Sequence, residues 1–214
     1  MNNKDKIILH LCADLGSDSE PYRKAGYDVR CIGKDIGVEN YIPPANVYGI
    51  IANPPCTHFS YAKTTGKPRD MQEGMKLVKE CLRVIWECQY KLEGNYSKKT
   101  SLKFWMIENP KGLLKYFLGI PALEYSPWEY GDNYKKSTNI WGNFTIPLKK
   151  YSNANQTMTK DELEKAKTNS RKLPKFDRLK TKEIAPKYYG KLTRQERRSI
   201  CSEYFAKAFY EANT

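Results

Sequence analysis

The sequence predicts one α/β domain with a mostly parallel, twisted sheet and helices on both faces. Short apolar runs that are typical of buried strands recur at 6–12, 28–32, 47–52 and 102–107. A helical pattern separates two of them, with apolar residues on one stripe over 71–90. Strands that alternate with helices form parallel sheets whose two faces are both covered. A chain of 214 residues has room for one such domain with a substantial core.

The chain opens with a strand, a turn, a helix and a second strand. The first strand, 6–12, runs into a turn of small and acidic residues at 13–19. A short helix over 20–26 has proline near its start and glycine at its end, and a strand over 28–32 follows. Such a turn against a helix N-terminus commonly holds a nucleotide-like ligand, although a single glycine makes this a weak motif. Asp35 lies about twenty residues farther on, where a carboxylate can accept hydrogen bonds from ribose hydroxyls.

A cysteine follows the third strand directly. The strand over 47–52 is stopped by Pro54 and Pro55, which lack the backbone N–H of a sheet ladder, and Cys56 comes next. Strand ends are where α/β sheets place ligands and chemistry. A rigid backbone fixes where the sulfur points, so Cys56 is a candidate nucleophile. The alternative is a small buried hydrophobe at a turn, the usual role of a free cysteine.

The middle of the chain contains a second strand that ends in a polar side chain and a proline, after an intervening loop and helix. A basic, glycine-containing loop over 61–70 is predicted to be a mobile lid beside the cysteine, and the helix over 71–90 follows. After a polar loop at 94–101, the strand over 102–107 ends in Glu108-Asn109-Pro110. In a parallel sheet the two strand ends face the same edge, so the thiol and the carboxyl group could meet there. The alternative for Glu108 is a solvated carboxylate or a helix cap, which is the more common role of a carboxyl group at such a position.

The remaining elements are a short helix over 113–117, a late strand over 139–144 and helices toward the C-terminus. Thr159 with Glu162, and Thr193 with Glu196, have the spacing of capping boxes. The last helix is predicted to bury one apolar face, which carries Tyr204, Phe205, Ala208 and Phe209.

Positive charge is concentrated in one quarter of the chain. The formal net charge is +13. Residues 149–198 hold 16 Lys or Arg against 6 Asp or Glu, a net charge of +10. This segment indicates a surface that binds phosphates, as in a nucleic-acid partner. The alternative is a solvated basic tail.

The cysteines indicate a reducing cytoplasm, because the six show no C-x-x-C pair. With only two histidines, this argues against a structural zinc, and we expect no metal. The sequence shows no long apolar run and no signal peptide, so no membrane association is expected. A monomer or weak dimer is expected.

Several stretches together resemble the DNA cytosine-5 methyltransferase family, particularly its compact phage and mobile-element members. The strongest is Pro-Pro-Cys, two variable residues, then Phe-Ser at 54–60, followed by Ile-Glu-Asn at 107–109. Tyr130-Gly131 begins a loop in which Tyr134, Lys136 and Thr138 take the glutamine and arginine positions of the family. Residues 12–17 resemble the cofactor motif, with Asp14 and Ser17 in place of two glycines.

The resemblance implies a Rossmann-like, class I S-adenosylmethionine-dependent methyltransferase fold. It assigns Cys56 to attack on cytosine C6, Glu108 to binding or protonating N3, Asn109 to holding the Glu108 loop, and Lys136 to keeping the thiolate. It divides the chain into a catalytic domain over 1–148, a shortened basic substrate-binding segment over 149–198 and a C-terminal helix over 199–214 that packs back. DNA is the implied partner, with the base flipped out if the substrate is a duplex. S-adenosyl-L-methionine is the implied cofactor, along Cys12, Ala13, Asp14, Leu15, Gly16, Ser17, Asp35, Asn53 and Pro55.

Three other functions stay open. Asn53-Pro54-Pro55 also resembles the motif of methyltransferases that modify exocyclic amines (N4 or N6), although Cys56 stands where those enzymes have an aromatic residue. Only about fifty residues follow the late strand before the last helix, too few for a full target-recognition domain, which favours free cytidine nucleotides as substrate. The altered glycine turn would suit a non-catalytic, nucleic-acid-binding relic.

Overall fold

The fold is described from a computed structural model over residues 2–13, 15–64, 66–93, 96–99, 102–152 and 158–214. The strands of the main sheet are β1 (Ile7–Leu11), β2 (Asp28–Ile32), β3 (Val47–Ala52), β6 (Phe104–Pro110), β7 (Leu123–Tyr125) and β8 (Thr138–Asn143). The helices are α1 (Glu20–Lys24), α2 (Met71–Gln89), α3 (Lys115–Leu118), α4 (Lys160–Arg171), α5 (Thr181–Ile184), α6 (Arg194–Arg197) and α7 (Glu203–Ala212). Short 3₁₀ turns are η1 (Asn3–Asp5), η2 (Pro127–Glu129), η3 (Phe176–Arg178) and η4 (Pro186–Tyr188).

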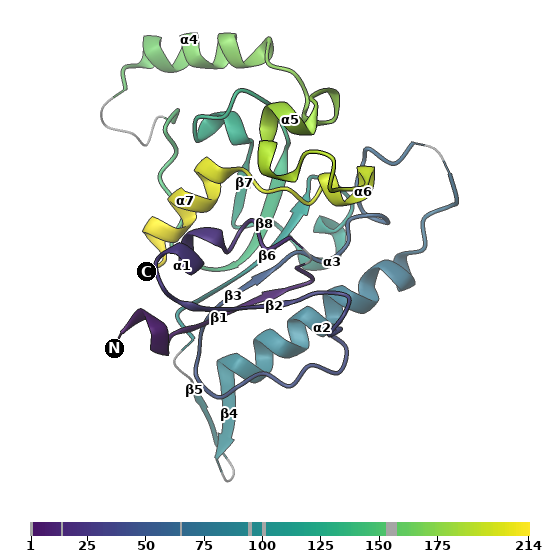
Figure 1. The fold of residues 1–214 in the computed structure, drawn as a ribbon, viewed down its shortest axis with the longest axis vertical. Coiled ribbons are helices and arrows are strands. Elements are labelled where there is room, and N and C mark those ends of the chain that lie inside the picture. The colour runs from purple at the N-terminus through teal and green to yellow at the C-terminus, as the bar shows by residue number, and fades with distance from the viewer. Residues whose placement is uncertain (1, 14, 65, 94–95, 100–101, 153–157) are drawn as a thin grey trace.

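The six strands form one sheet in the order β2-β1-β3-β6-β8-β7 (Figure 1). The first four strands are parallel, β8 runs antiparallel to β6, and β7 runs antiparallel to β8. The predicted α/β fold with a mostly parallel sheet is therefore confirmed. From β1 the chain turns to β2 on one side and later to β3 on the other, so the strand order reverses between β1 and β3. Open α/β sheets bind ligands at the carboxyl ends of strands at such a point.

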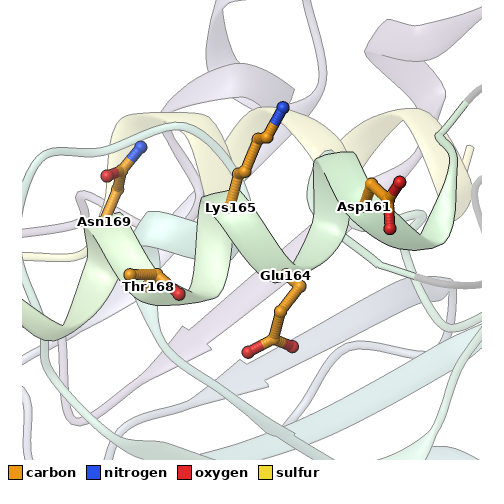
Figure 2. A pocket seen from close by; sticks show the side chains of 5 residues that line it. All are labelled: Asp161, Glu164, Lys165, Thr168 and Asn169. Atoms are coloured by element: carbon orange, nitrogen blue, oxygen red, sulfur yellow. The ribbon is translucent and has the colours of Figure 1, made fainter.

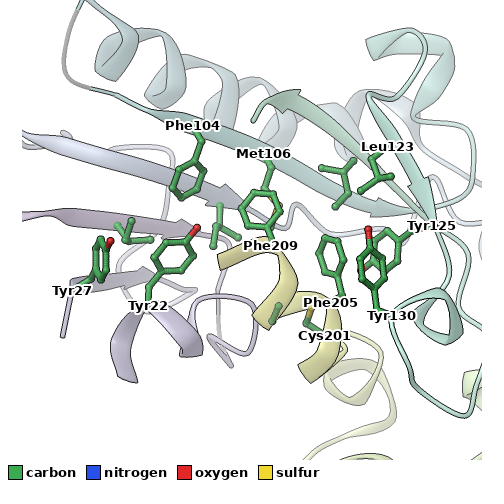
Figure 3. Close-up of a cluster of buried hydrophobic side chains, with 14 residues drawn as sticks. Tyr22, Tyr27, Phe104, Met106, Leu123, Tyr125, Tyr130, Cys201, Phe205 and Phe209 are labelled. Carbon is green, nitrogen blue, oxygen red and sulfur yellow. The ribbon is translucent and has the colours of Figure 1, made fainter. Parts of the chain in front are cut away.

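Both faces of the sheet are covered, and side chains alternate between them as the pleat requires. Helices α1 and α7 cover one face, where an aromatic-rich core gathers around Tyr22, Phe104, Phe205 and Phe209 (Figure 3). Helix α2 covers the other face, packing Cys81, Val84, Ile85 and Cys88 against sheet residues such as Leu9, Ile50 and Ile107. The sheet is thus the middle of three layers.

The basic segment packs back onto the sheet domain. Phe176, Ala185 and Ile200 form a small core with Tyr134, and Leu15 from the turn after β1 packs against it. Two backbone hydrogen bonds of 2.9 Å also join Lys135 to this segment: its N–H donates to the Pro174 carbonyl, and its carbonyl accepts the Phe176 N–H. The segment therefore lies over the same sheet edge as the turn after β1, where Figure 1 draws α5 and α6. The division at 148 and 198 stays a prediction.

Three local predictions differ from the structure. Part of the expected loop at 94–101 is strand, because β4 (Tyr90–Glu93) and β5 (Tyr96–Lys99) pair as an antiparallel hairpin. Strand β6 continues through Pro110, because β8 pairs with it as far as Thr138. Tyr204, expected on the buried face of the last helix, is 57% exposed.

The two predicted capping boxes are confirmed. The capping boxes at 159–162 and 193–196 are both formed, with each glutamate accepting from the threonine backbone N–H at 2.7 and 2.8 Å. Among helices within the described ranges, none combines the length and apolar character needed to cross a bilayer.

Candidate active site

Cys56 lies just past the carboxyl end of β3, in a tight turn. Pro54 is buried and Pro55 is exposed, so the Pro-Pro step carries the chain from the sheet to the surface. The Cys56 carbonyl accepts the backbone N–H groups of Phe59 and Ser60 at 3.0 and 2.9 Å. The thiol itself is partly buried. The backbone of Cys56 is therefore restricted by the two prolines before it and by the two hydrogen bonds to its carbonyl.

The loop of Cys56 is joined directly to the strand of Glu108. The Asn109 side-chain amide, which is fully buried, donates to the Pro54 carbonyl at 2.8 Å. Farther along, the Leu113 N–H donates to the Phe59 carbonyl at 2.8 Å. Gly112 is required at this crossing, because a Cβ there would stand 2.2 Å from the Phe59 carbonyl oxygen. The two predicted strand ends thus meet at one edge of the sheet.

Glu108 is held by a chain of polar side chains that crosses β3 to β1. Asn53 donates from its side-chain nitrogen to Glu108 Oε2 at 3.3 Å. The Asn53 side-chain oxygen lies 2.5 Å from His10 Nε2, and His10 Nδ1 lies 2.8 Å from the Ser19 hydroxyl. His10 and Ser19 are both buried. Asn53, predicted to bind a cofactor, therefore uses its side chain within the protein.

Burial and neighbouring charges set the ionisation of the site. Burial raises the pKa of the Cys56 thiol, the Glu108 carboxylate raises it further, and the Lys136 ammonium opposes both. Burial also raises the pKa of Glu108, while Lys136 and the Asn53 hydrogen bond lower it. The thiol and the carboxyl group are thus close enough to influence each other. A neutral Glu108 removes a negative charge that disfavours the Cys56 thiolate.

Lys136 links the site to the C-terminal segment. Its ammonium donates to the carbonyls of Arg198 and Ile200 at 2.9 and 3.2 Å, and it lies over the Phe176 ring. The expected thiolate-stabilising charge is therefore present, but burial of Cys56 outweighs it.

The turn after β1 has an unusual backbone and is partly covered. Cys12 adopts a positive φ of 55°, a strained conformation for a residue other than glycine, and Gly16 adopts 64°. Ala13 is buried, and the Ser17 hydroxyl accepts the backbone N–H of Cys201 at 3.1 Å. Leu15 packs against the basic segment. Asp14 lies outside the described residues.

The two remaining predicted cofactor residues, Asp35 and Pro55, are exposed. Asp35 is exposed in the turn that follows β2, and Pro55 is exposed beside Cys56. Both lie after the carboxyl ends of parallel strands, as a ligand along that edge would need.

No protein-family model matches this chain, and no curated protein matches it either. What the site can do therefore rests on its geometry and on the motifs in the sequence.

A surface pocket lies elsewhere, along α4. Its lining residues Asp161, Glu164, Lys165, Thr168 and Asn169 all belong to that one helix (Figure 2). None of the predicted site residues lines it. Within the part of the chain that the structure describes, no group of three or more His, Cys, Asp or Glu side chains could hold a metal ion.

The sequence predictions omit His10 and Ser19 from the site. A signal was available for His10, because it is the one polar residue in the strand Ile7–Leu11. A buried imidazole in an apolar strand needs hydrogen-bond partners. Its partners lie 9 and 43 residues away, so the sequence alone could not name them.

Proposed function

We propose that this protein is an S-adenosylmethionine-dependent methyltransferase that acts on C5 of cytosine in DNA. The observation that carries the proposal is the meeting of Cys56 and Glu108 at one sheet edge, tied together through Asn109 and Pro54. A thiol can attack a pyrimidine ring covalently, and a carboxyl group with a raised pKa can protonate the ring during the attack.

The chemistry follows from these two side chains. The Cys56 thiol loses its proton and its sulfur bonds to C6, which breaks the ring's aromaticity and moves electron density toward C5 and N3. Glu108 gives a proton to N3, so that negative charge does not build up on the ring. Once a methyl group has been added at C5, loss of the C5 proton to a base re-forms the C5–C6 double bond and expels the sulfur from C6 as the Cys56 thiolate, while the N3 proton returns to Glu108.

The neighbours of the pair support these roles. Lys136 favours the Cys56 thiolate by charge, and a Glu108 that carries its proton favours it too. The Asn53 amide, which donates to Glu108 Oε2, stabilises the carboxylate that remains after proton transfer. Asn109 keeps the Cys56 loop in register with Glu108.

The residues present fit S-adenosylmethionine in part. The strained turn at Cys12 to Gly16 stands at the point where strand order reverses, and the exposed Asp35 carboxylate can accept bonds from ribose hydroxyls. The side chains of Asn53 and Ser17 already have partners within the protein. When bound, the cofactor would supply the methyl group. Backbone groups of the turn and Asp35 would hold it.

DNA is the proposed substrate because of the basic segment. Its charge of +10 is carried largely on exposed side chains, and Lys136 joins it to the site through Arg198. Phosphate contacts of this kind position a nucleic acid without specifying its sequence.

The proposal is tested by methyl transfer from labelled S-adenosylmethionine to duplex DNA, single-stranded DNA and dCMP, followed by nucleoside analysis. We expect 5-methylcytosine in DNA, with a loss of roughly a thousandfold or more in Cys56→Ala. The matched control is Cys88→Ala, which removes a buried thiol of α2 and should keep activity. An N4- or N6-methyl product, product in dCMP alone, or DNA binding without transfer would contradict the proposal.

A further inference from the structure

The side chains that reach Glu108 form an unbroken chain that starts at the turn after β1. Ser19 Oγ lies 3.2 Å from the Gly16 carbonyl oxygen and 2.8 Å from His10 Nδ1. From His10 the chain continues through Asn53 to Glu108 Oε2. His10, Asn53 and Glu108 come from three neighbouring parallel strands or their ends, so the sheet itself holds the spacing.

The hydrogen atoms of this series of side chains can be arranged in two ways, which differ in the direction of every hydrogen bond from Ser19 to Glu108. The Ser19 hydroxyl has one proton, which goes either to His10 Nδ1 or to the Gly16 carbonyl. If it goes to His10, the imidazole carries its proton on Nε2 and donates to the Asn53 oxygen, and the Asn53 nitrogen donates to an ionised Glu108.

In the other direction, a protonated Glu108 donates to the Asn53 oxygen and the Asn53 nitrogen donates to His10 Nε2. His10 then carries its proton on Nδ1 and donates to Ser19, which donates to the Gly16 carbonyl. The amide oxygen and nitrogen occupy nearly the same space, so Asn53 can turn over between the two arrangements. The second state holds one proton more than the first, and that proton is on Glu108.

We propose that His10 is a positioning residue for Glu108, whose change of tautomer lets Asn53 pair with the carboxyl group in either protonation state. This role deepens the proposed function, in which Glu108 gives a proton to cytosine N3 and must then stand as a carboxylate. In the ionised state the Gly16 carbonyl is released by Ser19, so the predicted cofactor turn is linked to the state of Glu108.

Other groups face the relay and act on it electrostatically. Around His10 these are Asp18, with its carboxylate 4.0 Å from Nε2, and Arg23. Around Glu108 they are Lys136, Asp18, Cys56, Tyr125 and Cys201. Burial lowers the pKa of His10, against the opposing effect of the Asp18 carboxylate, which favours the neutral imidazole in which the tautomer can vary.

The test is long-range proton–nitrogen NMR on protein with ¹⁵N-labelled histidine, with the Glu108 carboxyl carbon followed in parallel, from about pH 5 to about pH 9. His58 is an internal reference, because its Nδ1 accepts the Asp70 N–H at 2.8 Å and its neutral form should keep the proton on Nε2. We expect the His10 proton to move from Nδ1 to Nε2 with the same midpoint as Glu108 ionisation. In Glu108→Gln and in Asn53→Ala the His10 tautomer should not change over this range.

A fixed His10 tautomer while Glu108 ionises would overturn the proposal, and so would a Glu108 that keeps one protonation state throughout. The NMR result does not depend on methyl transfer. A tautomer change in a protein without transferase activity would contradict the proposed function but would support the role of His10 proposed here. Transferase activity with a fixed His10 tautomer would support the proposed function and contradict the role of His10.

Discussion

The buried side-chain amide of Asn109 donates a 2.8 Å hydrogen bond to the backbone carbonyl of Pro54. The two residues are 55 positions apart in the chain, and each neighbours one member of the Cys56–Glu108 pair. This hydrogen bond therefore joins the two strand ends on which the proposed chemistry depends, next to the ladder that pairs β3 with β6.

Replacing Asn109 by leucine should lower both the stability of the protein and its methyl-transfer activity. The Pro54 carbonyl loses its donor, which costs about 1–3 kcal/mol in the free energy of unfolding. Urea unfolding measures this cost, and kcat for methyl transfer should fall because the Cys56 loop is released. The control is Asn143→Ala, at an exposed position of β8, which should change stability by less than about 0.5 kcal/mol. Equal effects of the two substitutions would contradict the linking role of Asn109.

Replacing Lys136 by methionine should make Cys56 less reactive. The Lys136 ammonium lowers the pKa of the Cys56 thiol, so its removal raises that pKa and reduces the thiolate fraction at a given pH. Iodoacetamide alkylation of Cys56 against pH, read by peptide mass spectrometry, should shift to higher pH. Lys135→Met is the matched control, because the Lys135 ammonium donates instead to the Arg171 carbonyl at 2.9 Å. An unshifted alkylation profile in Lys136→Met would show that this charge does not act on the thiol.

Asp132 should make the protein less stable as pH rises. Burial raises the pKa of Asp132 to about 6, while its carboxyl accepts the hydroxyl of Ser202, the residue that caps α7. Since the folded pKa lies above the unfolded one, the stabilisation is complete below about pH 4 and is lost as pH rises through about 6.

Asp132→Asn keeps an acceptor for Ser202 and removes the ionisation. Because Asp132 is partly exposed, we expect the variant to be more stable than wild type by roughly 1–2 kcal/mol at pH 8 and about equal to it near pH 4. Denaturant unfolding at the two pH values measures this difference. A stability gap that does not depend on pH would be inconsistent with a raised pKa.

The basic segment should bind DNA through phosphates. Affinity for duplex DNA of unrelated sequences should fall with salt, with a slope in log–log form of about −0.9 for each phosphate contacted. Changing the exposed Lys180 and Lys182 to glutamine should reduce that slope, whereas changing Lys4 and Lys79, outside 149–198, should not. Fluorescence anisotropy at several salt concentrations measures it. Equal slopes for both double variants would remove the segment from the interface.

The strands and the meeting of the two strand ends were predictable because the signals are local. An apolar run followed by Pro54 and Pro55 fixes where β3 stops, and parallel strands present their carboxyl ends at one edge. The end of β6 was not predictable in the same way. Its extension through Pro110 depends on pairing with β8, which lies almost thirty residues farther along the chain and runs antiparallel.

The relay to Glu108 depends on the same kind of distant contact. The position of His10 in an apolar strand indicates that it needs partners, but only the fold brings Ser19 and Asn53 to it. Likewise the sequence suggests a charge at Lys136, and only the packing of the C-terminal segment shows that its ammonium also binds the carbonyls of Arg198 and Ile200.

The most direct test of the proposed mechanism is to trap the bond between Cys56 and the pyrimidine. A DNA oligomer containing 5-fluorocytosine, incubated with the protein and S-adenosylmethionine, should give a stable covalent adduct, because the fluorine at C5 cannot leave as the proton does. Peptide mapping should find the nucleotide on Cys56, and Cys56→Ala should give no adduct. An adduct on another cysteine, or bound oligomer that never becomes covalently attached, would contradict covalent catalysis at Cys56.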